Sequence, residues 1–219
     1  MEVWNYINGH WLTIGNWTLD HLWLIFVSNS IAVLIGVSLG IFIAGKGREE
    51  IADTVLYLAG IMMTIPSLAL FGLLMPALSA MNLPAIGFLP AVIALILYGQ
   101  LPILRNTYTA IREVDPAMIE AGRGMGMTPR QILVKIKLPL AVPVIMAGLR
   151  NAVVINIGIA TIAVFIGARG LGVPIFRGLR TSRMDMIITG AIFVSMLALI
   201  ADGLLAIAEN KLTPEGLKR

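Results

Sequence analysis

The side chains that most often do chemistry in proteins are scarce in this sequence. It has no cysteine, and its only histidines, His10 and His21, lie eleven positions apart near the N-terminus. That spacing does not suit two ligands on one helix face, so we expect no metal site, and no residue pattern indicates a catalytic group or a cofactor. The string Gly45-Lys46-Gly47-Arg48 does not fit the phosphate-binding pattern GxxxxGK[ST]. We therefore predict that the chain does not hydrolyse ATP by that route.

Two charged side chains, Arg150 and Asp202, lie well inside otherwise apolar stretches. Charges within a membrane usually face the bundle interior or water and find a partner, so we expect these two to lie near each other. The alternative is that each is solvated at the membrane surface. Three polar residues, Asn151, Asn156 and Thr161, either line a translocation path or hydrogen-bond neighbouring helices, and the glycine-rich surroundings favour the second role.

The composition indicates a membrane protein. Hydrophobic residues make up 58% of the 219 residues and charged residues only 13%, and the mean hydropathy is +0.90. A water-soluble domain is about half apolar and about a quarter charged. The net charge of +4 does not imply nucleic acid, because basic residues also mark the cytoplasmic loops of membrane proteins.

Five stretches are long and apolar enough to cross a bilayer, which takes about 20 residues. They cover residues 22–45, 51–80, 88–110, 138–168 and 186–208. Pro66 should kink the second span, and residues 169–185 should form a loop. The tryptophans around the start of the first span should anchor it at the interface. The sequence thus predicts an all-α integral membrane protein, a single domain over residues 1–219 with a bundle of about five transmembrane helices.

A polar segment, residues 115–137, separates the third and fourth spans. It should form two short helices. Asp115 ahead of Pro116 is typical of a helix N-terminus, and Thr128 with Gln131 predicts a capping box at the start of the second helix. Such a helix pair between spans is the least membrane-like part of the chain.

The basic residues predict the orientation. With the polar segment in the cytoplasm, eleven lysines and arginines lie inside and four lie outside, in agreement with the positive-inside rule. The N-terminus is then outside and the C-terminal tail, with Lys218 and Arg219, is inside. The outer arginines form either a docking surface for an acidic partner or an ordinary solvated loop. They are Arg169, Arg177, Arg180 and Arg183.

The residues from the polar segment into the fourth span resemble a family signature. The match consists of Glu120, Ala121, Gly122, Gly126, Ile136, Leu138 and Pro139. Their spacing resembles the pattern E-A-A-x3-G-x9-I-x-L-P of the permease subunits of binding-protein-dependent ABC importers. Only Gly122 departs from it, where the family usually has alanine. The resemblance implies that the polar segment docks on an ATPase subunit and couples its motion to the spans. A glycine at the turn would also let a partner's backbone approach closely.

Other stretches, residues 65–70, 101–108 and 156–163 among them, are similar to the osmoprotectant branch of these permeases, which imports glycine betaine, carnitine and choline. The resemblance implies two ATP-binding subunits, an extracytoplasmic substrate-binding protein and a second permease subunit, identical or different. It places the assembly in the cell (inner) membrane of a bacterium or archaeon, among membrane lipid. The alternatives are a permease for an amino acid or another small polar solute, and a membrane scaffold that transports nothing.

Overall fold

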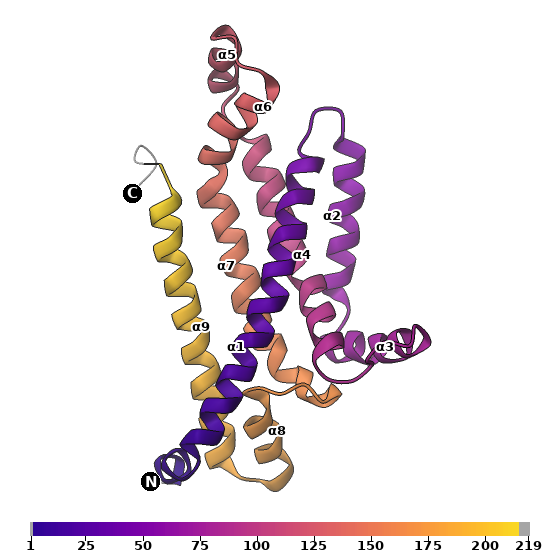
Figure 1. Ribbon diagram of the computed structural model, residues 1–219, viewed down its shortest axis with the longest axis vertical. Helices are drawn as coiled ribbons and strands as arrows, with labels where there is room; N and C mark the ends of the chain where they lie inside the picture. Colours follow the sequence, from indigo (N-terminus) through magenta and orange to yellow (C-terminus); the bar gives the residue numbers. More distant parts are fainter. Residues whose placement is uncertain (1, 215–219) are drawn as a thin grey trace.

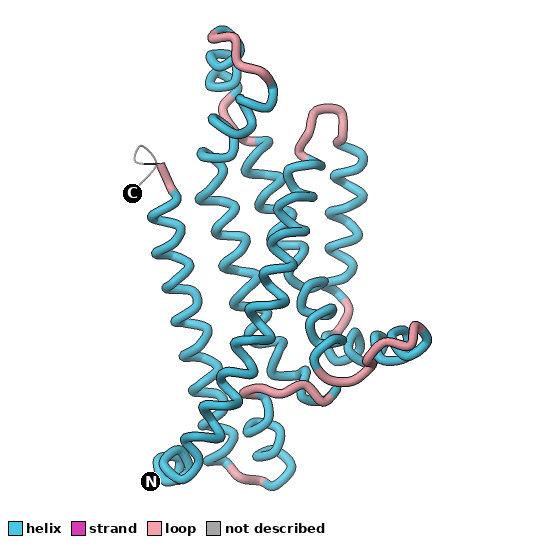
Figure 2. The backbone as a smooth tube through the Cα atoms, viewed as in Figure 1, coloured by secondary structure: helices cyan, strands magenta, loops and turns pink. Residues whose placement is uncertain are grey.

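The computed structural model describes residues 2–214, and all regular structure within that range is helical (Figures 1 and 2). In chain order the elements are α1 (Glu2–Ile43), α2 (Glu49–Thr64), α3 (Ser67–Ala80), α4 (Phe88–Arg112), α5 (Pro116–Gly124), α6 (Pro129–Ile132), the π-helical turn η1 (Leu133–Lys137), α7 (Leu138–Ile162), the 3-10 turn η2 (Ala163–Ile166), α8 (Gly172–Thr181) and α9 (Met184–Leu212). Within residues 2–214, four helices are long and apolar enough to cross a membrane, and the bent pair α2–α3 makes a fifth span if it counts as one. The expected all-helical membrane bundle is confirmed. Lys218 and Arg219 lie outside the described residues.

α1 is much longer than the predicted first span, residues 22–45. The helix begins at Glu2 and runs for 42 residues, with one non-helical position at His10. The helix is kinked at His10, and at 1.5 Å per residue the part from Trp11 to Ile43 is about 50 Å long, more than the hydrocarbon thickness of a bilayer, so part of α1 must extend beyond the membrane. Hydropathy marks only the part of a helix that lipid surrounds, and for this reason the sequence did not reveal the N-terminal turns, which carry the exposed Trp4 and Trp11.

Pro66 breaks the second predicted span, residues 51–80, rather than kinking it. α2 and α3 meet at an angle of 102°, and Ile65 between them is extended, with ψ at 125°. A proline disfavours the helical conformation in the residue before it, so Ile65 leaves the helix. The hydroxyl of Tyr98 on α4 donates a hydrogen bond to the Ile65 carbonyl at the break. As a result α3 projects sideways from the bundle (Figure 1).

α4 lies between α1 and α7 and packs closely against both. A Cβ atom added to Gly36 of α1 would lie 2.6 Å from Cγ2 of Ile103, and one added to Gly148 of α7 would lie 2.6 Å from Cβ of Asn106. Both neighbours belong to α4. Small residues let membrane helices approach until their backbones nearly touch, which is how this three-helix layer is packed.

The sequence had suggested that the polar segment is separate from the fourth span, but in the structure the second half of the segment continues into that span. Only α5 stands apart as a short helix, while α6, η1 and α7 follow one another without a break. The Leu138 N–H bonds to the carbonyl of Leu133, five residues earlier, so the helix is widened just before Pro139. A widened turn accommodates a proline, which has no N–H to donate.

The predicted loop, residues 169–185, contains the helix α8. It ends where Ser182 adopts a left-handed conformation with φ at 55°, and it packs tightly on α9, since a Cβ on Gly178 would lie 2.7 Å from Cγ1 of Ile187. α8 is too short and too polar for hydropathy to detect. It lies with the N-terminus at one end of the molecule, whereas α5, α6, the α1–α2 loop and the last turn of α9 lie at the other end (Figure 1).

Candidate functional site

Side-chain caps fix the start of both helices in the polar segment. A carboxylate oxygen of Asp115 accepts a hydrogen bond from the Ala117 N–H at 2.8 Å. The Thr128 hydroxyl accepts one from the Gln131 N–H at 3.3 Å, and the Gln131 side chain accepts one from the Thr128 N–H at 2.7 Å. The expected capping box is therefore present. These caps satisfy N–H groups that would otherwise lack partners, and they make the segment locally rigid.

Gly126 ends α5 in a left-handed conformation, with φ at 75°. Its N–H donates to the Arg123 carbonyl at 2.9 Å, and the Met127 N–H donates to the Gly122 carbonyl at 3.0 Å. This pair of bonds is a Schellman motif, which requires a positive φ at the position of Gly126. A Cβ atom at Gly126 would meet nothing within 4 Å. The backbone conformation of the chain itself therefore requires glycine at this position. From the sequence we had expected a different reason for the glycine, namely that it lets a partner's backbone approach closely.

Gly122, the one departure from the family signature, lies against Ile136, another signature residue. A Cβ atom on Gly122 would lie 2.7 Å from Cδ1 of Ile136, so an alanine would fit only if that isoleucine shifted. This contact ties α5 to the π-helical turn. The remaining signature residues are an exposed pair on α5 and a half-buried pair at the start of α7: Glu120 and Ala121, and Leu138 and Pro139.

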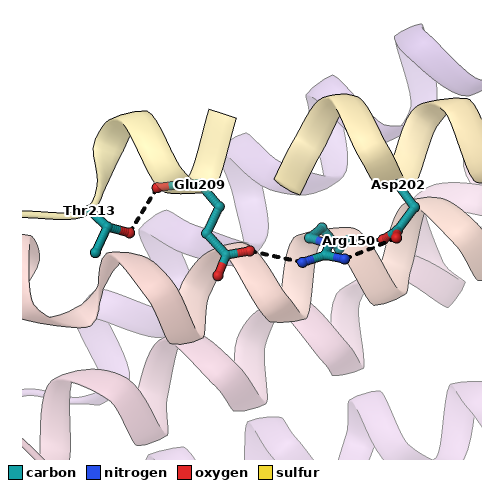
Figure 3. Close-up of polar contacts among 4 residues, drawn as sticks. All are labelled: Arg150, Asp202, Glu209 and Thr213. Atoms are coloured by element: carbon teal, nitrogen blue, oxygen red, sulfur yellow. Dashed lines mark hydrogen bonds and ion pairs between the residues drawn. The ribbon is translucent and has the colours of Figure 1, made fainter. Parts of the chain in front are cut away.

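The structure brings Arg150 and Asp202 together (Figure 3). The Arg150 Nε and Nη2 groups donate to the two carboxylate oxygens of Asp202 at 2.8 and 2.9 Å, and Nη1 donates to Glu209 at 3.0 Å. Glu209 was not anticipated, although it lies seven residues after Asp202 and hence two turns along the same face of α9. One guanidinium on α7 thus holds two carboxylates of α9 through charge-assisted hydrogen bonds.

Asn156 joins three helices. Its side-chain amide donates to Oδ1 of Asn29 on α1 and to the Leu95 carbonyl on α4, both at 3.0 Å, and the side chain is fully buried. Asn151 is exposed, and the Thr161 hydroxyl donates to a carbonyl of its own helix. The three polar residues singled out in the sequence therefore do not converge. Asn156 alone makes hydrogen bonds between helices, and its partner Asn29 had no sequence signal.

His21 is buried between α1, α7 and the stretch that leads into α8. Its Nδ1 accepts a hydrogen bond from the Leu171 N–H at 3.3 Å, and Nε2 lies 3.2 Å from the Ile157 carbonyl. Because Nδ1 accepts, the ring proton must be on Nε2, which donates to Ile157. From the sequence, His21 was considered only as a possible metal ligand. No cluster suited to a metal ion occurs in the part of the chain that the structure describes.

The four arginines that were predicted to lie outside differ in their contacts. Arg183 donates two hydrogen bonds to the carboxylate of Asp185, which raises the pKa of Arg183 above its usual value, and its guanidinium lies 5.5 Å above the ring of Tyr6. All four are exposed, but Arg169, Arg177 and Arg180 make no ion pair with any described residue. A partner docking at this end would therefore meet three guanidinium groups free of ion pairs within the described chain.

Known proteins are similar to this chain along nearly its whole length. Residues 36–214 match the family described as binding-protein-dependent transport system inner membrane component. The osmoprotectant import permease protein OsmW of Salmonella typhimurium is 44% identical, over 94% of this chain and 94% of its own. The choline transport system permease protein OpuBB of Bacillus subtilis is 43% identical, over 92% of this chain and 89% of its own. The carnitine transport permease protein OpuCD of Listeria monocytogenes is 41% identical, over 100% and 97%.

Solved structures share the fold at lower identity. The inward-facing MetNI methionine ABC transporter matches with a TM-score of 0.78 at 23% identity, over 96% of this chain and 97% of the matched chain. An amino acid ABC transporter with histidines matches with a TM-score of 0.78 at 21% identity, over 94% and 97%. This chain therefore belongs to the family of binding-protein-dependent transport system inner membrane components.

Proposed function

We propose that this chain is the membrane-spanning permease subunit of an ATP-driven importer, and that the importer carries a small osmoprotectant such as glycine betaine, carnitine or choline. The observation that carries the proposal is the 41–44% identity, over nearly the full length, to permeases named for osmoprotectant, choline and carnitine transport. The amino-acid alternative has only a shared fold in its favour, at 21–23% identity. A scaffold that transports nothing has no observation in its favour.

In this function the polar segment is the element that couples ATP hydrolysis to the spans. Three features support that role. α5 is capped at both ends and is mostly exposed, it projects beyond the bundle (Figure 1), and α6 runs into α7 without a break. A push on the segment would therefore move α7 as a lever. Asn156 would pass that motion to α1 and α4, and Arg150 would pass it to α9.

The partners in this proposal are two ATP-binding subunits, a second permease subunit and an extracytoplasmic binding protein. The chain itself is not an enzyme, and ATP is hydrolysed by the partner subunits. The polar segment and the C-terminus lie in the cytoplasm and the N-terminus outside the inner membrane, a topology supported by the excess of basic residues around the segment. The exposed Arg169, Arg177 and Arg180 then face the binding protein, where they would speed its association with an acidic surface.

The transport cycle follows from this arrangement. ATP binding closes the two ATP-binding subunits, the two polar segments move together, and the spans change from inward to outward access. The binding protein delivers the substrate to the open spans. A quaternary ammonium group is best held by an aromatic cage, and we place that cage in the binding protein, so that the permease offers a weakly binding passage.

Uptake of radiolabelled glycine betaine into proteoliposomes tests the proposal. The chain is reconstituted with the ATP-binding subunit and binding protein encoded beside it, and Gly126→Val is compared with Gly124→Val. Both glycines lie on the same segment with open space around them, but only Gly126 has a positive φ, a conformation in which a β-branched residue is strongly disfavoured. We expect Gly126→Val to lower ATP-dependent uptake by at least about tenfold, the loss that roughly 1.4 kcal/mol of strain produces, and Gly124→Val to retain most of it.

The remaining outcomes separate the parts of the proposal. ATP hydrolysis that the loaded binding protein stimulates, without betaine uptake, would keep the importer and discard this substrate. Equal loss in both variants would discard the special role of the left-handed turn. If the chain binds no ATP-binding subunit, the importer proposal fails and a scaffold becomes the leading interpretation.

A further inference from the structure

A cavity of about 830 Å³ opens at the end of the bundle that carries the polar segment. Its walls come from the last turns of α1, the loop that joins α1 to α2, the last turn of α4, and the polar segment itself. The lining residues come from two stretches that are far apart in the sequence, 38–48 and 111–137, so the cavity is a product of the fold.

The charge that lines this cavity is of one sign. Five of the described residues that line it are cationic and none is a carboxylate: Lys46, Arg48, Arg112, Arg123 and Lys137. Two of the five are already engaged. Arg48 donates to the Phe42 carbonyl at 2.7 Å and lies 3.8 Å above the Phe42 ring, and Arg112 pairs with Glu49 at 2.9 Å.

The other three cations, Lys46, Arg123 and Lys137, make no ion pair with any residue between 2 and 214. They come from the α1–α2 loop, from α5 and from η1. Like charges that face one cavity repel one another unless an anion lies among them. Lys46 and Arg123 are exposed and Lys137 is half-buried, and all three line the cavity.

The cavity also has apolar walls, at the end of the predicted first span, residues 22–45. Ile41, Ile119 and Leu133 line it, and Phe42 at its edge is 49% exposed. The cationic loop follows directly on the apolar part of α1, which ends at Ile43. Headgroups of phospholipids lie at this boundary, and basic pockets between membrane helices bind them.

We propose that this cavity binds the phosphate headgroup of an anionic phospholipid. Lys46, Arg123 and Lys137 contact the phosphate, and Ile41, Phe42 and Leu133 contact the first carbons of the acyl chains. A bound lipid bridges the α1–α2 loop and the polar segment, two parts of the chain that move relative to each other if the segment transmits a push to α7. The proposal does not depend on which compound is transported.

Native mass spectrometry of the delipidated full chain in detergent tests this. Short-chain phosphatidylglycerol and short-chain phosphatidylcholine are titrated separately. The variant Lys46→Gln/Arg123→Gln/Lys137→Gln is compared with Arg169→Gln/Arg177→Gln/Arg180→Gln, which removes the same charge at the opposite end of the molecule. We expect phosphatidylglycerol to bind the wild type more tightly than phosphatidylcholine. The cavity variant should weaken phosphatidylglycerol about fivefold for each cation removed, on the order of a hundredfold for three, and the control variant should not.

Two further arms keep the test decisive. The variant Lys46→Arg/Arg123→Lys/Lys137→Arg preserves the charge and should bind phosphatidylglycerol nearly as the wild type does, which separates lost charge from lost folding. Inorganic phosphate and glycerol phosphate should compete only weakly, because they lack acyl chains. Strong binding of free phosphate without a preference for the lipid would overturn the lipid as occupant. Equal losses in the cavity and control variants, or no preference for phosphatidylglycerol, would overturn the site.

Discussion

The guanidinium of Arg150 contacts both carboxylate oxygens of Asp202, at 2.8 and 2.9 Å, across the interface between α7 and α9. The buried residues of α9 are Met186, Thr189, Gly190 and Leu197, so none lies in the part of the helix after Leu197. The two side chains are 31% and 39% exposed, and Glu209, which also binds Arg150, is 23% exposed. Partly shielded charges of this kind fix the C-terminal half of α9 against the bundle, where apolar packing contributes little.

We expect Arg150→Gln to lower the thermal unfolding midpoint more than Asp202→Asn, and Asp202→Asn more than Glu209→Gln. Removing Arg150 leaves two carboxylates of α9 with no cation, whereas removing either carboxylate leaves Arg150 with the other one. Thermal unfolding of the purified chain in detergent measures the order. Equal midpoints for the three variants would contradict it.

The exchange Arg150→Asp with Asp202→Arg tests the pairing itself. The exchanged pair should transport better than either single change, but recovery should be incomplete, because the carboxylate placed at position 150 would face Glu209. Adding Glu209→Gln should therefore improve it. Uptake by the two single variants, the double exchange and the double exchange with Glu209→Gln gives the answer. A double exchange no better than the worse single change would mean that the contact has no role in transport.

Gly122 and Ile136 should be energetically coupled. Alanine is about 1 kcal/mol better than glycine inside a helix, but at Gly122 its methyl group would collide with Cδ1 of Ile136. We expect Gly122→Ala alone to be neutral or destabilising, and to stabilise by up to about 1 kcal/mol in the background of Ile136→Val, which lacks that methyl group. A double-mutant cycle of unfolding free energies measures the coupling. Additive effects would show that the isoleucine relaxes freely.

Hydropathy predicted the membrane-crossing parts of the fold well. Expected spans at residues 88–110 and 186–208 correspond to α4 (Phe88–Arg112) and α9 (Met184–Leu212). It failed where helices leave the membrane, as in the first turns of α1, or are short and polar, as in α8. The consequence of Pro66 was underestimated because a kink and a 102° break have the same local cause. Which of the two forms depends on contacts with residues distant in the sequence, such as the hydrogen bond from the Tyr98 hydroxyl to the Ile65 carbonyl.

In the candidate site too, the sequence predicted some contacts and gave no sign of others. The caps made by Asp115 and Thr128 are local, within three residues, and the sequence predicted both. Arg150 and Asp202 could be paired in advance because charges inside spans are rare. The partnership of Asn156 with Asn29 spans 127 residues, and no local pattern in the sequence marks a contact of that kind.

Replacing His21 should destabilise the chain strongly. His21→Leu leaves the buried Leu171 N–H without its acceptor and removes the bond from His21 to the Ile157 carbonyl, so we expect a loss of roughly 1–3 kcal/mol. The matched control is His10→Leu, because His10 is exposed and its contacts, a hydrogen bond to the Tyr6 carbonyl and stacking on the Tyr6 ring, lie within its own helix. Unfolding in detergent and hydrogen exchange at the Leu171 amide measure the difference. Similar stability in the two variants would show that the stretch before α8 is held by other contacts.

Asn156→Ala distinguishes a role in joining helices from a role in a translocation path. The buried amide makes two hydrogen bonds to other helices, and bonds of this kind in membranes contribute about 0.6 kcal/mol each, so the loss should be about 1 kcal/mol. Asn151→Ala on the same helix is the control, since that side chain is exposed. Unfolding and the substrate dependence of uptake are measured together. If Asn156 joins helices, stability falls while KM for the transported compound is unchanged. A path residue would give the opposite result, a changed KM at unchanged stability, because it contacts the substrate rather than its neighbours.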